Sequence, residues 1–286
     1  MTTINLLVTL NEKYLAPLKT VLTSIKLNNK QQKLHIWLIH QSISDKQLNL
    51  LNRFINHLGW QLTTKKVEHD WIQTKIATIH NYPPEMYFRL LAGEILPNSV
   101  KKVIYLDPDV LVINSIKPLW DWPLNNDMMA AASHTGLVDV VTPINNLRLN
   151  TEGKYYNTGV LLMNLDKMRQ IVEPKAIQQL IESHREMLVL PDQDVLNYLY
   201  GKHITEIPEE IWNYDARKFN TYQMRSLGEN NLQWIMKHTA ILHFAGSPKP
   251  WEVKSDSRFT ALYLQYENWA ENIAAKLAIK WIITSL

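Results

Sequence analysis

Short apolar runs alternate with amphipathic stretches over the first 67 residues, and this alternation strongly limits the fold that the chain can adopt. We predict strands over 4–10, 34–39 and 61–67, and helices over 14–27 and 44–58, where apolar residues recur at three-and-four spacing. Strands separated by helices at this pace pair in parallel, in an α/β sheet with helices on both faces. Ligands of such sheets bind beyond the carboxyl ends of the strands.

A later apolar run, 103–112, is interrupted by two carboxylates. In extended backbone Asp107 and Asp109 leave on the same face, with their Cα atoms about 7 Å apart. Carboxylates this close repel unless a cation lies between them, and oxygen ligands suit Mg²⁺ or Mn²⁺. Pro108 cannot donate a ladder hydrogen bond, so regular pairing is predicted to stop there. Asp-Pro-Asp is also common in surface turns, but charges inside a buried run favour a metal site.

The composition excludes several classes of function. A chain of 286 residues is long enough for one large domain, or for one domain with an extension. Without cysteine there is no disulfide framework, thiolate zinc site or cysteine nucleophile. A net charge of +3 without a basic aromatic stripe argues against nucleic acid as a partner. The N-terminus lacks signal-peptide features and no apolar run reaches the ~20 residues of a membrane span, so we expect a cytoplasmic location.

Three polar segments each have a structural and a functional interpretation. Arg89, on a helix predicted over 84–91, is either a surface residue with a buried stem or is buried against a carboxylate or phosphate. The segment 192–194, Asp-Gln-Asp, precedes an apolar stretch; helix capping explains one of its aspartates but not all three polar groups. His243 ends a strand predicted over 239–243 and is either an ordinary polar residue or a ligand.

Two loops are the other candidates for binding. Residues 134–154 are long, polar and irregular, which is typical of a lid or binding loop. A strand over 155–164 follows, and its Gly159 indicates either close approach of the backbone to a ligand or a bulge. Near the end of the chain Lys249 lies on a stiff loop between two prolines, and Gly246 leaves room for a phosphate to meet the backbone. We also predict a strand over 128–132 and a helix over 174–187.

Taken together, these segments resemble the retaining glycosyltransferases of family 8, which include bacterial lipopolysaccharide glucosyl- and galactosyltransferases and the glycogenins. The resemblance runs in order from about residue 4 to residue 251. The motifs that carry it are Tyr87-Phe88-Arg89-Leu90, Asp107-Pro108-Asp109, Tyr156-Asn157-Thr158-Gly159-Val160-Leu161, Asp192-Gln193-Asp194-Val195-Leu196-Asn197 and His243-Phe244-Ala245-Gly246-Ser247-Pro248-Lys249-Pro250-Trp251.

The resemblance implies a GT-A type nucleotide-sugar-binding domain over 1–255, with a mostly parallel central sheet, followed by a C-terminal helical extension over 256–286. It implies a UDP-sugar donor and a metal held by Asp107, Asp109 and His243. An oxygen-rich site with one imidazole suits Mn²⁺ somewhat better than Mg²⁺, which is the alternative.

The resemblance also implies donor-binding positions. Gly246 and Lys249 would hold the diphosphate, and Asp192 and Gln193 are the implied catalytic residues. Family members often have an Asp pair after the first strand to bind uracil and ribose, whereas this chain has Thr9-Leu10-Asn11, whose side chains can still form hydrogen bonds. The full set of expected donor-binding residues is Thr9, Asn11, Arg89, Asp107, Pro108, Asn157, Asp192, Gln193, Gly246 and Lys249.

The implied reaction moves glucose or galactose to a glycan, glycolipid or glycoprotein acceptor and retains the anomeric configuration. Retention in hydrolases usually needs a carboxylate nucleophile, but Gln193 is a poor one. We therefore expect the acceptor hydroxyl to attack from the face that UDP leaves. One alternative is a catalytically weak sugar-nucleotide-binding or scaffold protein. A haloacid-dehalogenase-type phosphatase is another, although that pattern has Thr or Val where Leu111 stands and usually lies near the N-terminus.

The last segment, 269–286, has its own alternatives. Trp269, Ile273, Leu277 and Trp281 fall near one helical face, with lysines nearby. One expectation is that this helix lies on anionic lipid and attaches the protein peripherally to the inner face of the membrane. Another is that the helix lies on a partner protein. A packed terminal helix or a homo-oligomer contact explains the same pattern.

Overall fold

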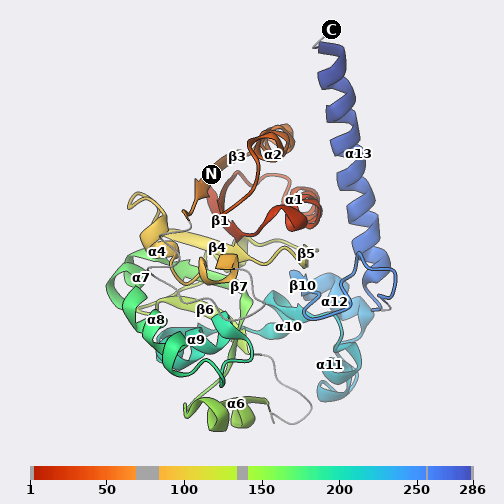
Figure 1. The fold of residues 1–286 in the computed structure, drawn as a ribbon. Helices are drawn as coiled ribbons and strands as arrows, with labels where there is room; N and C mark the ends of the chain where they lie inside the picture. The colour runs from red at the N-terminus through yellow and green to blue at the C-terminus, as the bar shows by residue number, and fades with distance from the viewer. Residues whose placement is uncertain (1–2, 69–83, 134–140, 256, 285–286) are drawn as a thin grey trace.

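The computed structural model describes residues 3–68, 84–133, 141–255 and 257–284 (Figure 1). Its strands are β1 (Ile4–Thr9), β2 (Leu34–His40), β3 (Gln61–Lys66), β4 (Lys102–Leu106), β5 (Val110–Val112), β6 (Met129–Ser133), β7 (Tyr156–Asn164), β8 (Ile204–Glu206), β9 (Tyr214–Asp215) and β10 (Ile241–His243).

The α-helices are α1 (Leu15–Asn28), α2 (Asp45–His57), α4 (Ala92–Ile95), α5 (Lys117–Trp120), α6 (Val141–Leu149), α7 (Leu165–Ile171), α8 (Pro174–Ser183), α9 (Pro191–Tyr200), α10 (Glu209–Trp212), α11 (Phe219–Arg225), α12 (Leu232–His238) and α13 (Thr260–Thr284). Short 3₁₀ helices are η1 (Glu12–Tyr14), η2 (Pro84–Tyr87) and η3 (Gly201–His203).

The central sheet of the described chain has seven strands in the order β3-β2-β1-β4-β7-β6-β8. Strands β3, β2, β1 and β4 pair in parallel, as do β6 and β8, whereas β7 runs antiparallel to both β4 and β6. The predicted α/β class with a mostly parallel sheet is therefore confirmed, and β4 lies in the middle of the sheet.

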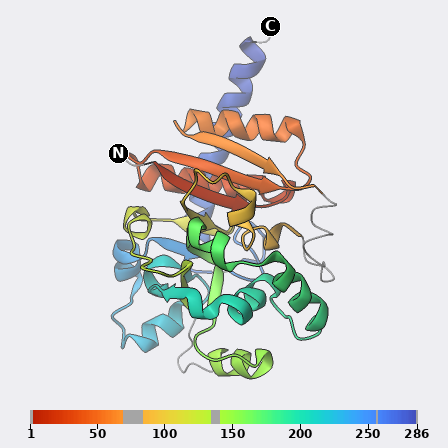
Figure 2. The same ribbon diagram turned by 90° about the vertical axis from the view of Figure 1, so that its left-hand side faces the viewer.

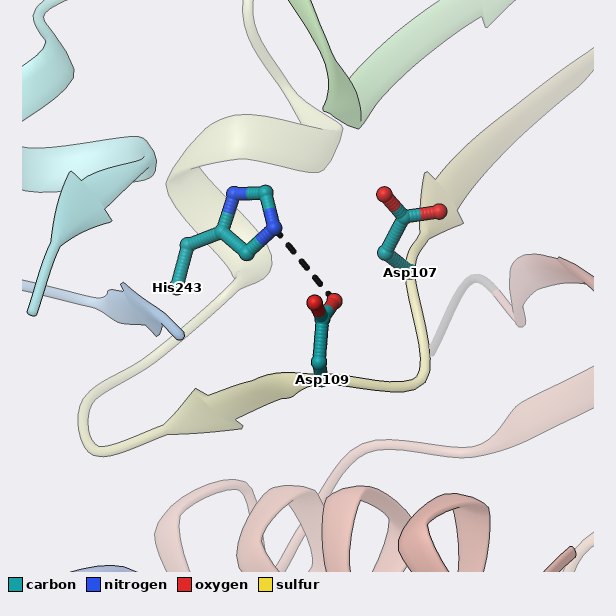
Figure 3. Close-up of side chains that lie close together, drawn as sticks. All are labelled: Asp107, Asp109 and His243. Atoms are coloured by element: carbon teal, nitrogen blue, oxygen red, sulfur yellow. Dashed lines mark ion pairs between the residues drawn. The ribbon is translucent and has the colours of Figure 1, made fainter. Parts of the chain in front are cut away.

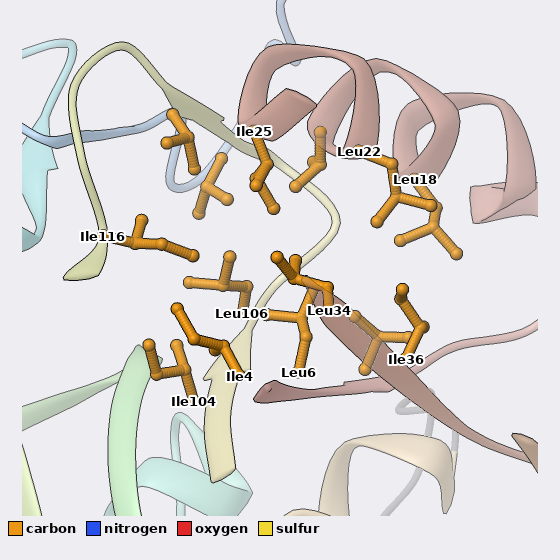
Figure 4. Close-up of a cluster of buried hydrophobic side chains, with 14 of the residues drawn as sticks. Ile4, Leu6, Leu18, Leu22, Ile25, Leu34, Ile36, Ile104, Leu106 and Ile116 are labelled. Atoms are coloured by element: carbon orange, nitrogen blue, oxygen red, sulfur yellow. The ribbon is translucent and has the colours of Figure 1, made fainter. Parts of the chain in front are cut away.

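Strand β4 separates two of the three cores of the described chain because its side chains alternate between the faces of the sheet. Ile104 and Leu106 face a core shared with α1 and α2 (Figure 4), and Val103 and Tyr105 face a second core with α7, α8 and α9. Since all four side chains are fully buried, β4 is fixed on both faces. The residues that follow it therefore start from a rigid position.

The chain leaves the central sheet at Pro108 and enters a second sheet, in which β5 is antiparallel to β10 and β10 is parallel to β9. Ladder pairing of β4 ends at Leu106, as the proline predicted. The small sheet was not predicted as a separate unit. It places His243, the last residue of β10, opposite Val110, next to Asp109.

Two predicted segments are corrected. The helix expected over 84–91 is the 3₁₀ helix η2 followed by turns, with i→i+3 bonds such as Phe88 N–H to Glu85 O at 3.2 Å. Its apolar residues Tyr87, Phe88, Leu90 and Leu91 are all buried, so the segment lacks the solvent-facing side of an amphipathic helix.

The loop expected to be irregular over 134–154 contains the nine-residue helix α6. Pro143 lies in its first turn, where a backbone N–H needs no helical partner. Residues 134–140 lie outside the described part of the chain.

The C-terminal helix α13 packs along α1 and its end extends past α2, away from the sheet (Figures 1 and 2). Ala270 is buried, and Ile273 and Leu277 pack against the first core, so a packed terminal helix accounts for this face. Trp269 is exposed, and the side chain of Trp281 lies outside the described residues. No helix in the described ranges is long and apolar enough to cross a membrane.

Candidate functional site

A pocket of about 640 Å³ opens at the carboxyl ends of β1 and β4. This volume falls in the range of small-molecule and cofactor sites. The structure brings together there every residue that the sequence predicted for the site: Thr9, Asn11, Arg89, Asp107, Pro108, Asp109, Asn157, Asp192, Gln193, Gly246, Lys249 and His243 all line it. Their individual roles stay predictions.

Asp107, Asp109 and His243 converge on one side of the pocket (Figure 3). One ligand atom from each of the three lies within 4.8 Å of the other two. His243 Nε2 is 3.3 Å from Asp109 Oδ1, and that buried oxygen accepts no hydrogen bond within the described part of the chain. Carboxylate oxygens and one imidazole facing a common point fit a divalent cation such as Mn²⁺.

The imidazole of His243 is oriented by Asn213, which the sequence analysis missed. His243 Nδ1 lies 2.8 Å from Asn213 Oδ1, so Nδ1 carries the proton and Nε2 is left to face Asp109. Asn213 Nδ2 donates to Asn157 Oδ1 at 2.9 Å, and Asn157 Nδ2 donates to Gln193 Oε1 at 3.0 Å. A chain of hydrogen bonds thus connects the candidate metal ligand to the candidate catalytic amide.

Gly159 is required by this arrangement. A Cβ atom at Gly159 would lie 2.3 Å from His243 Cε1 and 3.0 Å from Asp107 Oδ2, so no other residue fits without moving them. The close approach, one of the two alternatives predicted here, is made by neighbouring side chains of the protein itself. The pairing of β7 with β6 also shifts register between Leu161 and Tyr156, as the bulge alternative predicted.

The charges in this group stabilise one another. Burial opposes ionisation of Asp109, but His243 and Lys249 outweigh it and hold the pKa of Asp109 well below its usual range. Burial alone would lower the pKa of His243, yet the attraction to Asp109 raises it. Asp109 is therefore ionised and ready to bind a cation.

Arg89 is buried against two carboxylates, so the second interpretation of this residue is correct. Its Nη1 lies 2.9 Å from Asp107 Oδ1 and its Nε 3.4 Å from Asp192 Oδ2. Nη1 also donates to Thr158 O at 3.0 Å, and the guanidinium stacks 4.4 Å from the centre of the Tyr105 ring. Although burial opposes the charge, Asp107, Tyr105 and Asp192 together raise the pKa of Arg89, which is a fixed cation in the wall of the pocket.

Asp192 and Gln193 enter the pocket from the first turn of α9. Asp192 Oδ2 accepts a hydrogen bond from Thr158 Oγ1 at 2.9 Å. Burial raises the pKa of Asp192, and Arg89 opposes this. Neither side chain caps its own helix, so capping does not explain them.

The third residue of that motif, Asp194, has a structural role. It is fully buried and accepts hydrogen bonds from Arg148 Nη1 and Nη2 at 2.8 and 2.7 Å, from Tyr155 OH, and from the backbone N–H groups of Val189 and Leu190. Arg148 belongs to α6 and also binds Asn145 Oδ1 at 2.8 Å, which lines the pocket. The ion pair therefore attaches α6 to the start of α9.

The segment after β1 makes local contacts. Thr9 Oγ1 is 3.3 Å from Tyr105 OH, and Tyr105 OH donates to Asp107 Oδ1 at 2.6 Å. Asn11 accepts a hydrogen bond from Lys13 N–H at 3.1 Å and caps η1. Both side chains line the pocket, but each already has a partner.

Beside the candidate metal ligands, Lys249 Nζ binds Asp109 Oδ2 and donates to Phe244 O at 3.2 Å. Gly246 has φ +75°, which favours glycine. Asp215, the last residue of β9, and Arg217, two residues after it, also line the pocket. Nothing in the sequence identified them, because the small sheet that positions them was not predicted.

A mostly parallel sheet with two carboxylates at the end of its central strand places the pocket where ligands of α/β sheets bind, and the fold is of the GT-A class. The sequence model of glycosyl transferase family 8 matches residues 5–255. The chain belongs to this family and is a glycosyltransferase.

Individual relatives agree with the family. General stress protein A of Bacillus subtilis (strain 168) is 23% identical over 269 residues, covering 91% of this chain and 92% of that protein. A lipopolysaccharide 1,2-glucosyltransferase of Escherichia coli (strain K12) is 24% identical over 270 residues, with 91% and 77% covered. The crystal structure of the galactosyltransferase LgtC with donor and acceptor sugar analogs superposes with a TM-score of 0.75 at 20% identity, covering 93% of this chain and 95% of that one.

Replacing Asn213 with alanine is predicted to weaken Mn²⁺ binding about 10- to 100-fold, because His243 loses the acceptor that fixes its tautomer and ring orientation. Calorimetric titration with Mn²⁺ measures the change. Asn114→Ala is the control. The Asn114 amide, like that of Asn213, makes two hydrogen bonds, here to the backbone carbonyls of Met236 and Thr239, but Asn114 does not line the pocket. Equal Mn²⁺ affinity in both variants would contradict the role of Asn213.

Replacing Asp194 with alanine is predicted to lower the free energy of unfolding by about 3–5 kcal/mol, because Arg148 and two backbone N–H groups lose their buried acceptor. Urea denaturation measures the change. Asp166→Ala is the control, because the ion pairs of Asp166 with Lys101 and Arg169 lie at the surface, where such pairs contribute little to stability. A similar small loss in both variants would show that Asp194 does not anchor α6.

Proposed function

We propose that the protein is a retaining hexosyltransferase that moves glucose or galactose from a UDP-sugar to a glycan, glycolipid or glycoprotein acceptor. The observation that carries the proposal is the convergence of Asp107, Asp109 and His243 beside the buried Arg89 in one pocket. In a family of glycosyltransferases, a cluster of cation ligands at the end of a central strand suits the diphosphate of a nucleotide sugar.

The proposed metal is Mn²⁺, with Mg²⁺ as the alternative, held by Asp107, Asp109 and His243. When bound, it supplies a Lewis acid that neutralises the diphosphate and eases the departure of UDP. The protein's own cation Lys249 lies beside Asp109, where it would bind the same diphosphate. Gly246 is proposed to contact the same diphosphate through its backbone, beside Arg217, whose guanidinium lies where the Cβ atom of residue 246 would be.

The proposed sugar-binding residues are Arg89, Asn157, Asp192 and Gln193. Arg89 and Asp192 are held by ion pairing, and Asn157 and Gln193 by their mutual hydrogen bond. Hydrogen bonds from such fixed groups to sugar hydroxyls stabilise the transition state if they strengthen as the anomeric carbon gains positive charge. Pro108 lies in the same wall, and Thr9 and Asn11 are proposed to contact the nucleoside from the end of β1.

The proposed mechanism retains the anomeric configuration without a carboxylate nucleophile under the sugar. By its resemblance to the family, Gln193 is proposed to stand where a nucleophile would be, and its Oε1 accepts a hydrogen bond from Asn157. A neutral amide is a weak nucleophile, so the acceptor hydroxyl attacks from the face that UDP leaves. The departing phosphate takes the proton of that hydroxyl.

Two other functions were considered from the sequence, a phosphatase and a catalytically weak sugar-nucleotide-binding protein. Family membership sets aside the phosphatase. A catalytically weak sugar-nucleotide-binding protein remains an alternative that turnover would exclude, and the complete set of Asp107, Asp109 and His243 favours an enzyme.

Names of relatives support a cell-surface glycan as acceptor, since one is a lipopolysaccharide 1,2-glucosyltransferase. The division into a domain over 1–255 and a helical extension over 256–286 stays a prediction. Attachment of 269–286 to membrane or to a second copy remains a prediction, as does the cytoplasmic location.

UDP release from a panel of UDP-sugars tests the donor and the metal together. We expect Mn²⁺-stimulated release for UDP-glucose or UDP-galactose, and a loss of about 100-fold or more in Asp109→Ala, because the site loses a charged ligand. Asp121→Ala is the control, since Asp121 is an exposed carboxylate paired with Lys117. If the protein neither binds nor hydrolyses any UDP-sugar in the presence of metal, the donor assignment is overturned. If it binds a UDP-sugar without turnover, the scaffold alternative is correct.

Gln193→Glu tests the absence of a nucleophile. The introduced carboxylate is expected to trap a covalent hexose that mass spectrometry detects, whereas the wild type carries none. NMR of the wild-type product should show the anomeric configuration of the donor. An inverted product would exclude attack from the leaving face.

A further inference from the structure

The side chain of Arg217 is held rigidly at the mouth of the pocket by Asp215. Its Nε and Nη2 donate to Asp215 Oδ1 and Oδ2 at 2.9 and 2.8 Å, and its backbone N–H donates to Asp215 Oδ1 at 3.0 Å. Asp215 is fully buried, whereas the Arg217 side chain is 48% exposed. A bidentate contact of this kind fixes the plane of the guanidinium and leaves its outer edge, which carries Nη1, unused by Asp215.

That outer edge rests on Gly246. A Cβ atom at Gly246 would lie 2.2 Å from Arg217 Nη1 and 3.2 Å from its Cζ, so the guanidinium occupies the place of the missing side chain. Nη1 donates to no acceptor within the described residues. Arg217 and Gly246 both line the pocket, as does Lys249, three residues after Gly246.

The charge of Arg217 exceeds what Asp215 alone requires. Lys218 Nζ lies 3.8 Å from Asp215 Oδ2, so this carboxylate already has a second cation nearby. Hydrogen bonds to Asp215 raise the pKa of Arg217, and Asp109 contributes to the same shift, which indicates that the guanidinium is close enough to sense the candidate metal ligand. The oriented N–H edge of Arg217 and the ammonium group of Lys249, from the loops after β9 and β10, both line the pocket and favour an anion there.

We propose that Arg217 binds the sugar-linked phosphate of the donor diphosphate and holds this phosphate in the UDP product. The inference rests on the proposed function, because it takes the diphosphate to lie along Gly246 and Lys249. Arg217 contacts the phosphate through Nη1, in the fixed orientation that Asp215 gives it. Lysine at this position keeps the charge but lacks the fork that binds Asp215 and phosphate together.

Calorimetric titration of UDP and UMP in excess Mn²⁺ tests the assignment. Arg217→Met is expected to raise the Kd for UDP about tenfold, the lower end of the range for a hydrogen bond to a charged group. The Kd for UMP should change less than about twofold, since UMP lacks the second phosphate, and Arg217→Lys should lie between wild type and Arg217→Met. Arg258→Met is the control, because Arg258 stacks on Phe219 and does not line the pocket.

Arg217→Met also leaves Asp215 with one fewer partner, which destabilises the protein for a reason unrelated to binding. The double variant Asp215→Asn with Arg217→Met removes both charges and separates the two effects. Its thermal midpoint should recover relative to Arg217→Met, while its Kd for UDP stays high. Recovery of UDP affinity in the double variant would show that Arg217 only neutralises Asp215.

Other outcomes overturn the inference in distinguishable ways. Equal changes for UDP and UMP, or none, would show that the second phosphate is not the target. An unchanged Kd for UDP with a raised acceptor KM would place the contact on the acceptor. Failure of the wild type to bind UDP at all would overturn the proposed function together with this inference, whereas normal wild-type binding with an unaffected Arg217→Met would overturn this inference alone.

Discussion

Buried carboxylates determine how this site is built, because an ionised group inside a protein is stable only when a cation or several donors face it. Asp109, Asp192, Asp194 and Asp215 are all buried at or beside the pocket. Asp109, Asp192 and Asp194 pair with cations from distant segments, Lys249, Arg89 and Arg148 respectively, and Asp215 pairs with Arg217, two residues away. The pocket therefore forms only when the central sheet, α6, α9 and the small sheet are all in place.

The two sheets divide the work at Pro108. Strand β4 fixes Asp107, because its four buried side chains are held by cores on both faces. Strand β5 fixes Asp109, through its pairing with β10, and β10 brings His243 to the same point. A single continuous strand would hold the two aspartates but would not bring the imidazole. Because the chain changes sheets at Pro108, the Asp-Pro-Asp motif, which alone is common in surface turns, here contributes two of three converging ligands.

The sequence predicted those parts of the structure that depend on local pattern. Periodicity identified β1, β2, β3, α1 and α2, and Pro108 predicted the end of β4 pairing. Periodicity did not identify α6. This helix is held by an ion pair between Arg148 and Asp194, two residues that are 46 positions apart. Residues that act through long-range contacts, such as Asn213 and Arg217, lack any pattern in their own neighbourhood.

Two glycines show how closely the functional groups are packed, since in each case a side chain would occupy the place of a functional group. A Cβ atom at Gly159 would collide with His243, and a Cβ atom at Gly246 would collide with Arg217. For Gly159 the sequence left open a close approach to a ligand or a bulge, and for Gly246 it indicated room for a phosphate. In the structure a side chain that faces the pocket lies where the Cβ atom of each glycine would be, so each glycine positions a binding group. Substitutions at Gly159 should therefore act through the position of His243, and those at Gly246 through Arg217 and the φ of +75°.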